Sequence, residues 1–194
     1  MAQFERGFKT WAERTSTSLR KDLNLVPSAP FDAHALTKYL DVQVLTPAEV
    51  PGLPRAVLNQ LLVTDPSGWS ATTLVMDGYS LIIYNPGHSE SRRGSDLAHE
   101  LAHLILDHKP ATLIMSQDGD MVIRTYDQQQ EDEASWLAAC LLLPREALWS
   151  IRRRRLSDER ACSEFGVSLA MLRFRFNTSG VDVQLQRARR ANRD

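Results

Sequence analysis

The sequence predicts an α+β domain in which helices pack around a small antiparallel sheet. Three observations support this class. Apolar residues recur at helical spacing over residues 3–24. Two strand-like runs, 69–76 and 79–84, flank Asp77-Gly78, which is the two-residue signal of a hairpin turn. Helical patterns return over residues 128–177, so helices precede and follow this hairpin along the chain.

The elements before the hairpin follow from apolar spacing and from residues that start or stop helices. Apolar residues at helical spacing from Phe4 to Leu19 define a first helix, which ends before Pro27. Asp32 is suited to cap a short second helix at 33–40. The remaining elements are a strand at 42–45, a proline-rich connection at 46–54 and a helix at 55–63.

The elements after the hairpin are mostly helical. An apolar helical pattern begins at about residue 92 or 95 and continues to Asp107, and Pro110 marks its end. Pro144 divides a later pattern, because proline is tolerated in the first turn of a new helix. We expect a strand at 121–126, helices at 128–143, from Pro144, at 157–165 and at 168–177, and a frayed tail from 181 to 194.

Length and composition bound the kind of protein. The 194 residues suit a single domain, and an apolar content of 43% is too high for a disordered chain. We divide the chain into an N-terminal helical segment (1–30), a core (31–150) and a basic helical C-terminal segment (151–194) that belongs to the same domain.

The expected compartment follows from what the sequence lacks. No apolar run approaches 18 residues, so we expect no membrane-spanning helix, and the first residues lack the apolar region of a signal peptide. Cys140 and Cys162 are too few for a disulfide framework and are expected to be reduced and buried. We therefore expect a cytoplasmic protein.

The motif His99-Glu100-Leu101-Ala102-His103 lies in an apolar helical run. Side chains four residues apart share one face of a helix, so both imidazoles can bind one ion. Glu100 can face a water on that ion, which is the arrangement of a zinc hydrolase with a glutamate as general base. The alternative is a core helix whose histidines are satisfied by hydrogen bonds.

A catalytic zinc site needs a third protein ligand. The longer pattern H-E-x-x-H-x-x-G-x-x-H fails, because Leu106 and Lys109 stand at its last two fixed positions, and His108 is one residue off. The helix at 128–143 is the better source. Glu131 lies one turn before the apolar stripe of that helix and can face the motif, whereas Glu133 is about 200° away and is expected to be solvated.

Three segments together resemble the ImmA/IrrE metallopeptidases. Residues 81–86 form a strand that leads to an Asn, and residues 96–106 are similar to the family's A-H-E-L-x-H-x-x-L. Residues 131–144 are similar to its E-x-x-A-N-x-F-A-x-x-L-L-x-P, although Ser135 replaces the usual Asn or Asp and Leu137 replaces the Phe. The likeness extends over about residues 30–180.

The resemblance implies a zincin-like metallopeptidase domain with core 31–150, acting as a cytoplasmic zinc-dependent endopeptidase, with manganese as the alternative ion. It places the third ligand at Glu131, in agreement with the facing argument, and gives Ser135 the role of orienting a ligand histidine. Known members cut or inactivate a helix-turn-helix repressor in stress, phage or mobile-element regulation. A repressor or antitoxin-like protein is therefore the expected partner, and the chain is expected to be a stand-alone peptidase domain.

The expected mechanism gives one role to each residue. Glu100 takes a proton from the attacking water and later delivers it to the leaving amine. The oxyanion needs a donor, for which Tyr84, His88 and Tyr126 are the candidates. The strand at 69–76 can pair with an extended peptide substrate.

The basic C-terminal segment supports a competing function. The chain has a formal net charge of −1, yet residues 150–194 hold 11 Arg against 5 acidic residues. Residues 157–180 resemble a helix-turn-helix, which would make the protein a DNA-binding or repressor-binding regulator that does not cleave. Leu169 and Ala170 stand where base-reading side chains are needed, and Arg173 and Arg175 could contact phosphate only. A packed helical pair is the favoured interpretation.

Overall fold

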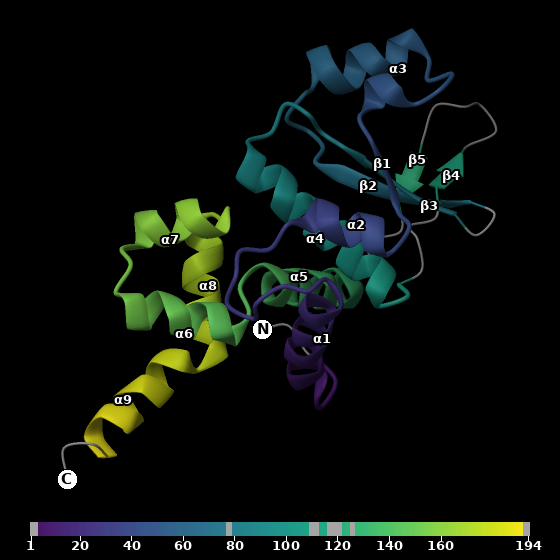
Figure 1. Cartoon of the computed structure of the whole chain (residues 1–194). Coiled ribbons are helices and arrows are strands. Elements are labelled where there is room, and N and C mark those ends of the chain that lie inside the picture. The colour runs from purple at the N-terminus through teal and green to yellow at the C-terminus, as the bar shows by residue number, and fades with distance from the viewer. Residues whose placement is uncertain (1–3, 77–78, 109–112, 116–121, 125–126, 192–194) are drawn as a thin grey trace.

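The computed structural model describes residues 4–76, 79–108, 113–115, 122–124 and 127–191. The predicted α+β class is confirmed, with most of the described residues in helices (Figure 1). The elements are α1 (Phe8–Asp22), α2 (Ala33–Tyr39), β1 (Gln43–Leu45), a 3-10 turn (Pro47–Glu49), α3 (Arg55–Asn59), a π-helical turn (Gln60–Thr64), β2 (Ala71–Met76), β3 (Tyr79–Tyr84), α4 (Glu90–Ile105), β4 (Leu113–Met115), β5 (Val122–Arg124), α5 (Gln128–Leu142), α6 (Arg145–Arg154), α7 (Asp158–Phe165), α8 (Leu169–Ser179) and α9 (Val181–Ala191).

The main sheet has the strand order β1-β3-β2, with β2 at one edge. Strands β2 and β3 form the predicted antiparallel hairpin, in which Met76 pairs with Tyr79. The expected small sheet is antiparallel except at β1, which pairs with β3 in parallel. A parallel pairing needs a long connection, and residues 46–78, which include β2, supply it. A separate pair, β4 and β5, is antiparallel, and β4 was not predicted.

Helices α4 and α5 form the centre of the molecule. They pack against each other more extensively than any other pair of described elements, and α4 also contacts β2 and β3. Figure 1 shows the sheet on one side of this pair and helices α6 to α9 on the other. The apolar positions of α4 and α5 are almost fully buried: Leu97, Ala98, Leu101, Ala102, Ala134, Leu137, Ala138 and Leu141. The helix that carries the motif is therefore fixed by the core itself.

The C-terminal end of α5 is buried, and side chains from other helices bind its last carbonyl groups. Ser16 of α1 donates to the Cys140 carbonyl oxygen at 2.7 Å, and Arg20 donates to that of Leu141 at 2.8 Å. Arg175 of α8 donates from Nε to the Leu143 carbonyl oxygen at 2.8 Å. The final carbonyls of a helix have no partner within the helix, so these three donors replace water where the core excludes it.

The C-terminal helices pack as a group on the core. Gly166 ends α7 and Gly180 ends α8, each with a positive φ (62° and 73°), which glycine adopts at low cost. The expectation that residues 181–194 fray was wrong for 181–191, which form α9. Val181 is fully buried, and Asp182 accepts two hydrogen bonds from Arg152, each at 2.8 Å. The buried Val181, this ion pair and a hydrogen bond of 2.8 Å from Arg145 to Gln184 hold the helix although its apolar pattern is sparse.

The two cysteines differ in how deeply they are buried. Cys140 is buried as predicted, whereas Cys162 is only partly so. Burial raises the pKa of the Cys140 thiol to about 12. Within the described residues, no helix combines the length and the apolarity that crossing a membrane requires. The division of the chain at residues 30 and 150 stays a prediction.

Candidate metal centre

Helix α4 places His99 and His103 on one face, as their spacing requires. Its cap is Ser89, whose hydroxyl accepts a hydrogen bond from the Arg92 backbone at 3.4 Å, so the helix begins earlier than predicted. The Nε2 atoms of the two imidazoles lie 3.1 Å apart. Both rings are partly buried, with 26% of the His99 side chain and 17% of the His103 side chain exposed. The two imidazoles therefore form one compact, partly buried pair rather than two separate surface groups.

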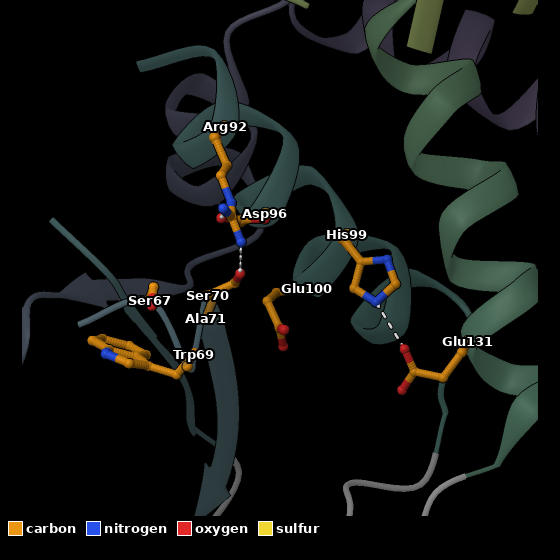
Figure 2. A pocket seen from close by; sticks show the side chains of 10 residues that line it. Ser67, Trp69, Ser70, Ala71, Arg92, Asp96, His99, Glu100 and Glu131 are labelled. Carbon is orange, nitrogen blue, oxygen red and sulfur yellow. Dashed lines mark hydrogen bonds and ion pairs between the residues drawn. The ribbon is translucent and has the colours of Figure 1, made fainter. Parts of the chain in front are cut away.

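Glu131 reaches this pair from the first turn of α5. Asp127 caps that helix by accepting from the backbone of Gln129 at 2.9 Å, which fixes where the first turn starts. One Glu131 oxygen lies 3.1 Å from Nε2 of His99, and the other lies 3.8 Å from Nε2 of His103. Figure 2 shows the carboxylate pointing from α5 towards the His99 ring. The three donor atoms lie within 4.8 Å of one another.

The three donors fit a divalent metal ion. Zinc bound by two imidazoles and one carboxylate has metal–ligand distances of about 2.0–2.1 Å, which separates donors in a tetrahedron by roughly 3.3 Å. The distances of 3.1 Å between the imidazoles and from His99 to Glu131 are close to that value. Two nitrogen donors and one oxygen donor are also the set found in catalytic zinc sites that keep one open position.

Glu100 lies beside this donor set and is 7% exposed. Its Oε2 accepts a hydrogen bond of 2.5 Å from the Thr73 hydroxyl on β2. Sequence reasoning did not identify Thr73. The signal that could have found it is the hairpin register, because Thr73 pairs with Ile82 and lies on the same face of the strand as the cavity residue Ala71.

A cavity of about 380 Å³ connects these side chains with the segment before β2. It is lined by Ser67, Gly68, Trp69, Ser70, Ala71, Arg92, Asp96, His99, Glu100 and Glu131. Figure 2 shows Glu100 between the strand and the His99–Glu131 pair, with Arg92 at the far end. Arg92 donates to the Ser70 hydroxyl at 3.1 Å and lies 3.9 Å from Asp96. The cavity thus brings the general-base candidate Glu100 together with two of the three metal donors, His99 and Glu131.

The comparison with known families shows which family this chain belongs to. A model described as the IrrE N-terminal-like domain, of a peptidase family, matches residues 61–177, which include every residue named in the donor set. The chain belongs to this family. Among curated proteins, none matches the chain. The family is one of peptidases, so a peptide-bond hydrolase is the class of enzyme that the match suggests, and the expected resemblance is confirmed.

The remaining predicted residues of this IrrE-like domain are placed as follows. Ser135 lies with its hydroxyl 3.5 Å from Nδ1 of His99, on the side of the ring away from Glu131. Tyr84 ends β3 and contacts the ring of His34, and it does not line the described part of the cavity. Tyr126 lies outside the described residues.

His88 differs from its expectation as an exposed loop residue. Its side chain is only 8% exposed, and its Nδ1 lies 3.1 Å from an Asp96 oxygen. Asn85, which is almost completely buried, holds the same loop by donating to the carbonyl oxygens of Pro66 and Trp69 at 2.6 and 3.0 Å. His88 therefore joins the start of α4 to the loop after β3, and it does not line the described part of the cavity.

Glu133 is also not solvated as expected. Its side chain is 14% exposed, and one of its oxygens lies 3.3 Å from Nε2 of His108. His108 is not one of the three converging donors of the IrrE-like site. Its other ring nitrogen instead faces His103, at 3.0 Å from Nδ1 to Nδ1. The facing argument failed here because the chain turns back after α4 and brings His108 to that flank of α5.

Proposed function

We propose that the protein is a zinc-dependent endopeptidase, with His99, His103 and Glu131 as metal ligands and Glu100 as general base. The observation that carries this proposal is the convergence of three suitable donors beside a buried carboxylate, all inside the residues that match the family. Zinc is favoured over manganese by the two imidazole ligands, since manganese prefers oxygen donors.

Each side chain has a defined task in this mechanism. Bound zinc would lower the pKa of water towards about 7 and polarise the scissile carbonyl. Glu100 accepts the proton of the attacking water and delivers it to the leaving amine. Thr73 holds Oε2 of Glu100, and the Glu100 side chain lines the cavity. An oxyanion stabiliser must donate hydrogen bonds into the cavity, and Arg92 and Ser70 are donors that line it. Tyr84 and His88 do not line the described part of the cavity, so Arg92 and Ser70 replace them as candidates.

The substrate is proposed to bind as an extended peptide along β2. This strand is at an edge of the sheet, and the residues just before it line the cavity. Main-chain hydrogen bonds to an edge strand select an extended backbone and leave side-chain choice to the neighbouring pockets. The family resemblance suggests a helix-turn-helix repressor as the partner. Cleavage of that repressor would give the protein a role in transcriptional and stress regulation in the cytoplasm.

The test is incubation of the purified enzyme with the helix-turn-helix protein encoded beside its gene. We expect cleavage that a chelator abolishes and added zinc restores, and Glu100→Gln should keep zinc but lose cleavage. Glu131→Ala should lower zinc content, whereas Asp132→Ala, one residue along the same turn, should leave it unchanged. Cleavage by Glu100→Gln at the wild-type rate would contradict the mechanism.

The same assay separates the alternative of a regulator that binds its partner without cutting it. In that case the two proteins co-elute and the partner stays intact in the presence of zinc. DNA binding through residues 157–180 is not favoured by the packing of this helical pair. Arg175 is buried and pairs with Glu13, so it is not available for the phosphate contact that the sequence suggested. Leu169 is exposed at a position where a DNA-binding helix needs a polar side chain to contact the bases.

A further inference from the structure

The chain turns back sharply where α4 ends. Asp107 adopts a left-handed conformation with φ 53°. Its backbone N–H donates to the Leu104 carbonyl oxygen at 3.2 Å, and the N–H of His108 donates to that of His103 at 3.0 Å. These two bonds make a Schellman motif, which returns the second residue after the helix cap over the last turn. Backbone geometry therefore places the His108 ring against the His103 ring.

The two rings continue into a chain of polar contacts that ends on α5. His103 and His108 approach through their Nδ1 atoms at 3.0 Å, and Nε2 of His108 lies 3.3 Å from Glu133. Gln129 in turn donates to the other Glu133 oxygen at 3.0 Å. Only 7% of the His108 side chain and 14% of the Glu133 side chain are exposed, so water does not replace these contacts freely.

The direction of these hydrogen bonds fixes which nitrogens carry hydrogen. A carboxylate only accepts, so Nε2 of His108 donates to Glu133. Nδ1 of a neutral His108 then accepts, and Nδ1 of His103 donates to it. His103 is left with its lone pair on Nε2, the atom that faces His99 and Glu131. The tautomer that metal binding requires is the one that this chain of contacts selects.

We propose that His108 and Glu133 are positioning residues that orient His103 for metal binding. This inference rests on the metal site of the proposed function. The two ligand histidines are supported unequally, because among the described residues Nδ1 of His99 has the exposed Ser135 hydroxyl as its partner, at the long distance of 3.5 Å. His103 is therefore held more firmly than His99, through the nearly buried contacts to His108 and Glu133. Partners of this kind typically change metal affinity by about 10–100-fold.

The test measures zinc affinity of the full-length protein by competition with a chromogenic chelator, together with urea unfolding of the zinc-free form. His108→Ala is expected to weaken zinc binding by about 10–100-fold. His108→Asn should restore part of the loss, since its amide oxygen can accept where Nδ1 did. Asp107→Gly is the matched control, because glycine suits φ 53° and leaves the turn intact, and it should bind zinc like the wild type.

A double-mutant cycle distinguishes a chain of contacts from two separate effects. If His108 transmits the influence of Glu133, Glu133→Ala weakens zinc binding alone but adds no further loss in the His108→Ala background. A purely structural pair would instead lower the stability of the zinc-free protein and leave zinc affinity unchanged, which would overturn the inference. If His108→Ala does not fold, the same comparison is made with His108→Asn.

Failure of this inference differs from failure of the proposed function. If the wild type binds zinc and Glu131→Ala does not, while the His108 variants bind as tightly as the wild type, only the positioning role is wrong. If the wild type itself binds no zinc, the proposed metal site is wrong and the positioning role falls with it. Partial rescue by His108→Asn together with an unchanged Asp107→Gly is the result expected here.

Discussion

Replacing Arg20 with Met tests how firmly helix α1 holds α5. Arg20 is completely buried and forks between two carbonyl oxygens, those of Ala29 at 2.7 Å and of Leu141 at 2.8 Å. Burial lowers the pKa of Arg20 to about 10, so the guanidinium remains charged at neutral pH. This positive charge also interacts favourably with the partial negative charge at the C-terminal end of α5.

The magnitude follows from the two acceptors that the substitution leaves behind. Met fills a similar volume and avoids burying a charge, which offsets part of the loss. Each buried carbonyl left without a partner costs about 1–3 kcal/mol. We therefore expect Arg20→Met to lower the free energy of unfolding by about 3 kcal/mol. With a urea dependence of about 2–3 kcal/mol per molar for a chain of this size, the unfolding midpoint falls by roughly 1–1.5 M.

The matched control is Arg14→Met, an exposed position on the same helix. A surface change of this kind is expected to stay within about 0.5 kcal/mol. Urea unfolding followed by circular dichroism measures both variants against the wild type. Equal midpoints for the two variants would refute the reasoning, because they would show that the Arg20 hydrogen bonds contribute no net stability to the end of α5.

Three further predictions concern the site, the buried thiol and the C-terminal helices. Thr73→Val removes the hydrogen-bond donor to Glu100 and should slow cleavage about 10-fold or more with zinc content unchanged. Thr73→Ser keeps the hydroxyl and should retain activity, and rate assays on both variants measure the difference. Because burial raises the Cys140 pKa to about 12, iodoacetamide at about pH 8 should label Cys162 first. The same raised pKa means that the folded state favours the neutral Cys140 thiol, so this contribution to the free energy of unfolding should be lost only as the pH rises above about 9. Since Arg175 is buried, duplex DNA should show no gel shift at low salt, and a salt-sensitive shift would contradict this.

Local signals predicted much of the fold correctly. The Asp32 cap, the hairpin around residues 77–78 and the helix start at Pro144 all depend on neighbouring residues, and all three are found in the structure. The start of α4 was placed too late, because the residues after Ser89 are polar and give no apolar periodicity. Parallel pairing of β1 could not be predicted, since a strand of three residues has too short a pattern to reveal its partner.

Long-range contacts account for the errors at the site. The spacing of His99 and His103 determines their common face, and the position of Glu131 one turn before the apolar stripe brings it to them. By contrast, the interpretation of Glu133 as solvated considered its own helix only. Its partner, His108, arrives through a left-handed residue at the end of another helix, a feature that neither composition nor periodicity reveals.

The position of Glu131 depends on residues far from the metal centre. Helix α5 has 15 residues, so its ends lie about 22 Å apart, and a helix of that length moves nearly as a rigid rod. Its N-terminal end carries Glu131, while its C-terminal end is bound by Ser16 and Arg20 of α1. Those two residues precede the part of the chain that matches the family, 61–177. Because the three proposed metal ligands come from two different helices, any tilt of α5 at its far end changes the distance between Glu131 and the histidines. Helix α1 thus belongs to the structural support of the site, although it contributes no residue to the described cavity.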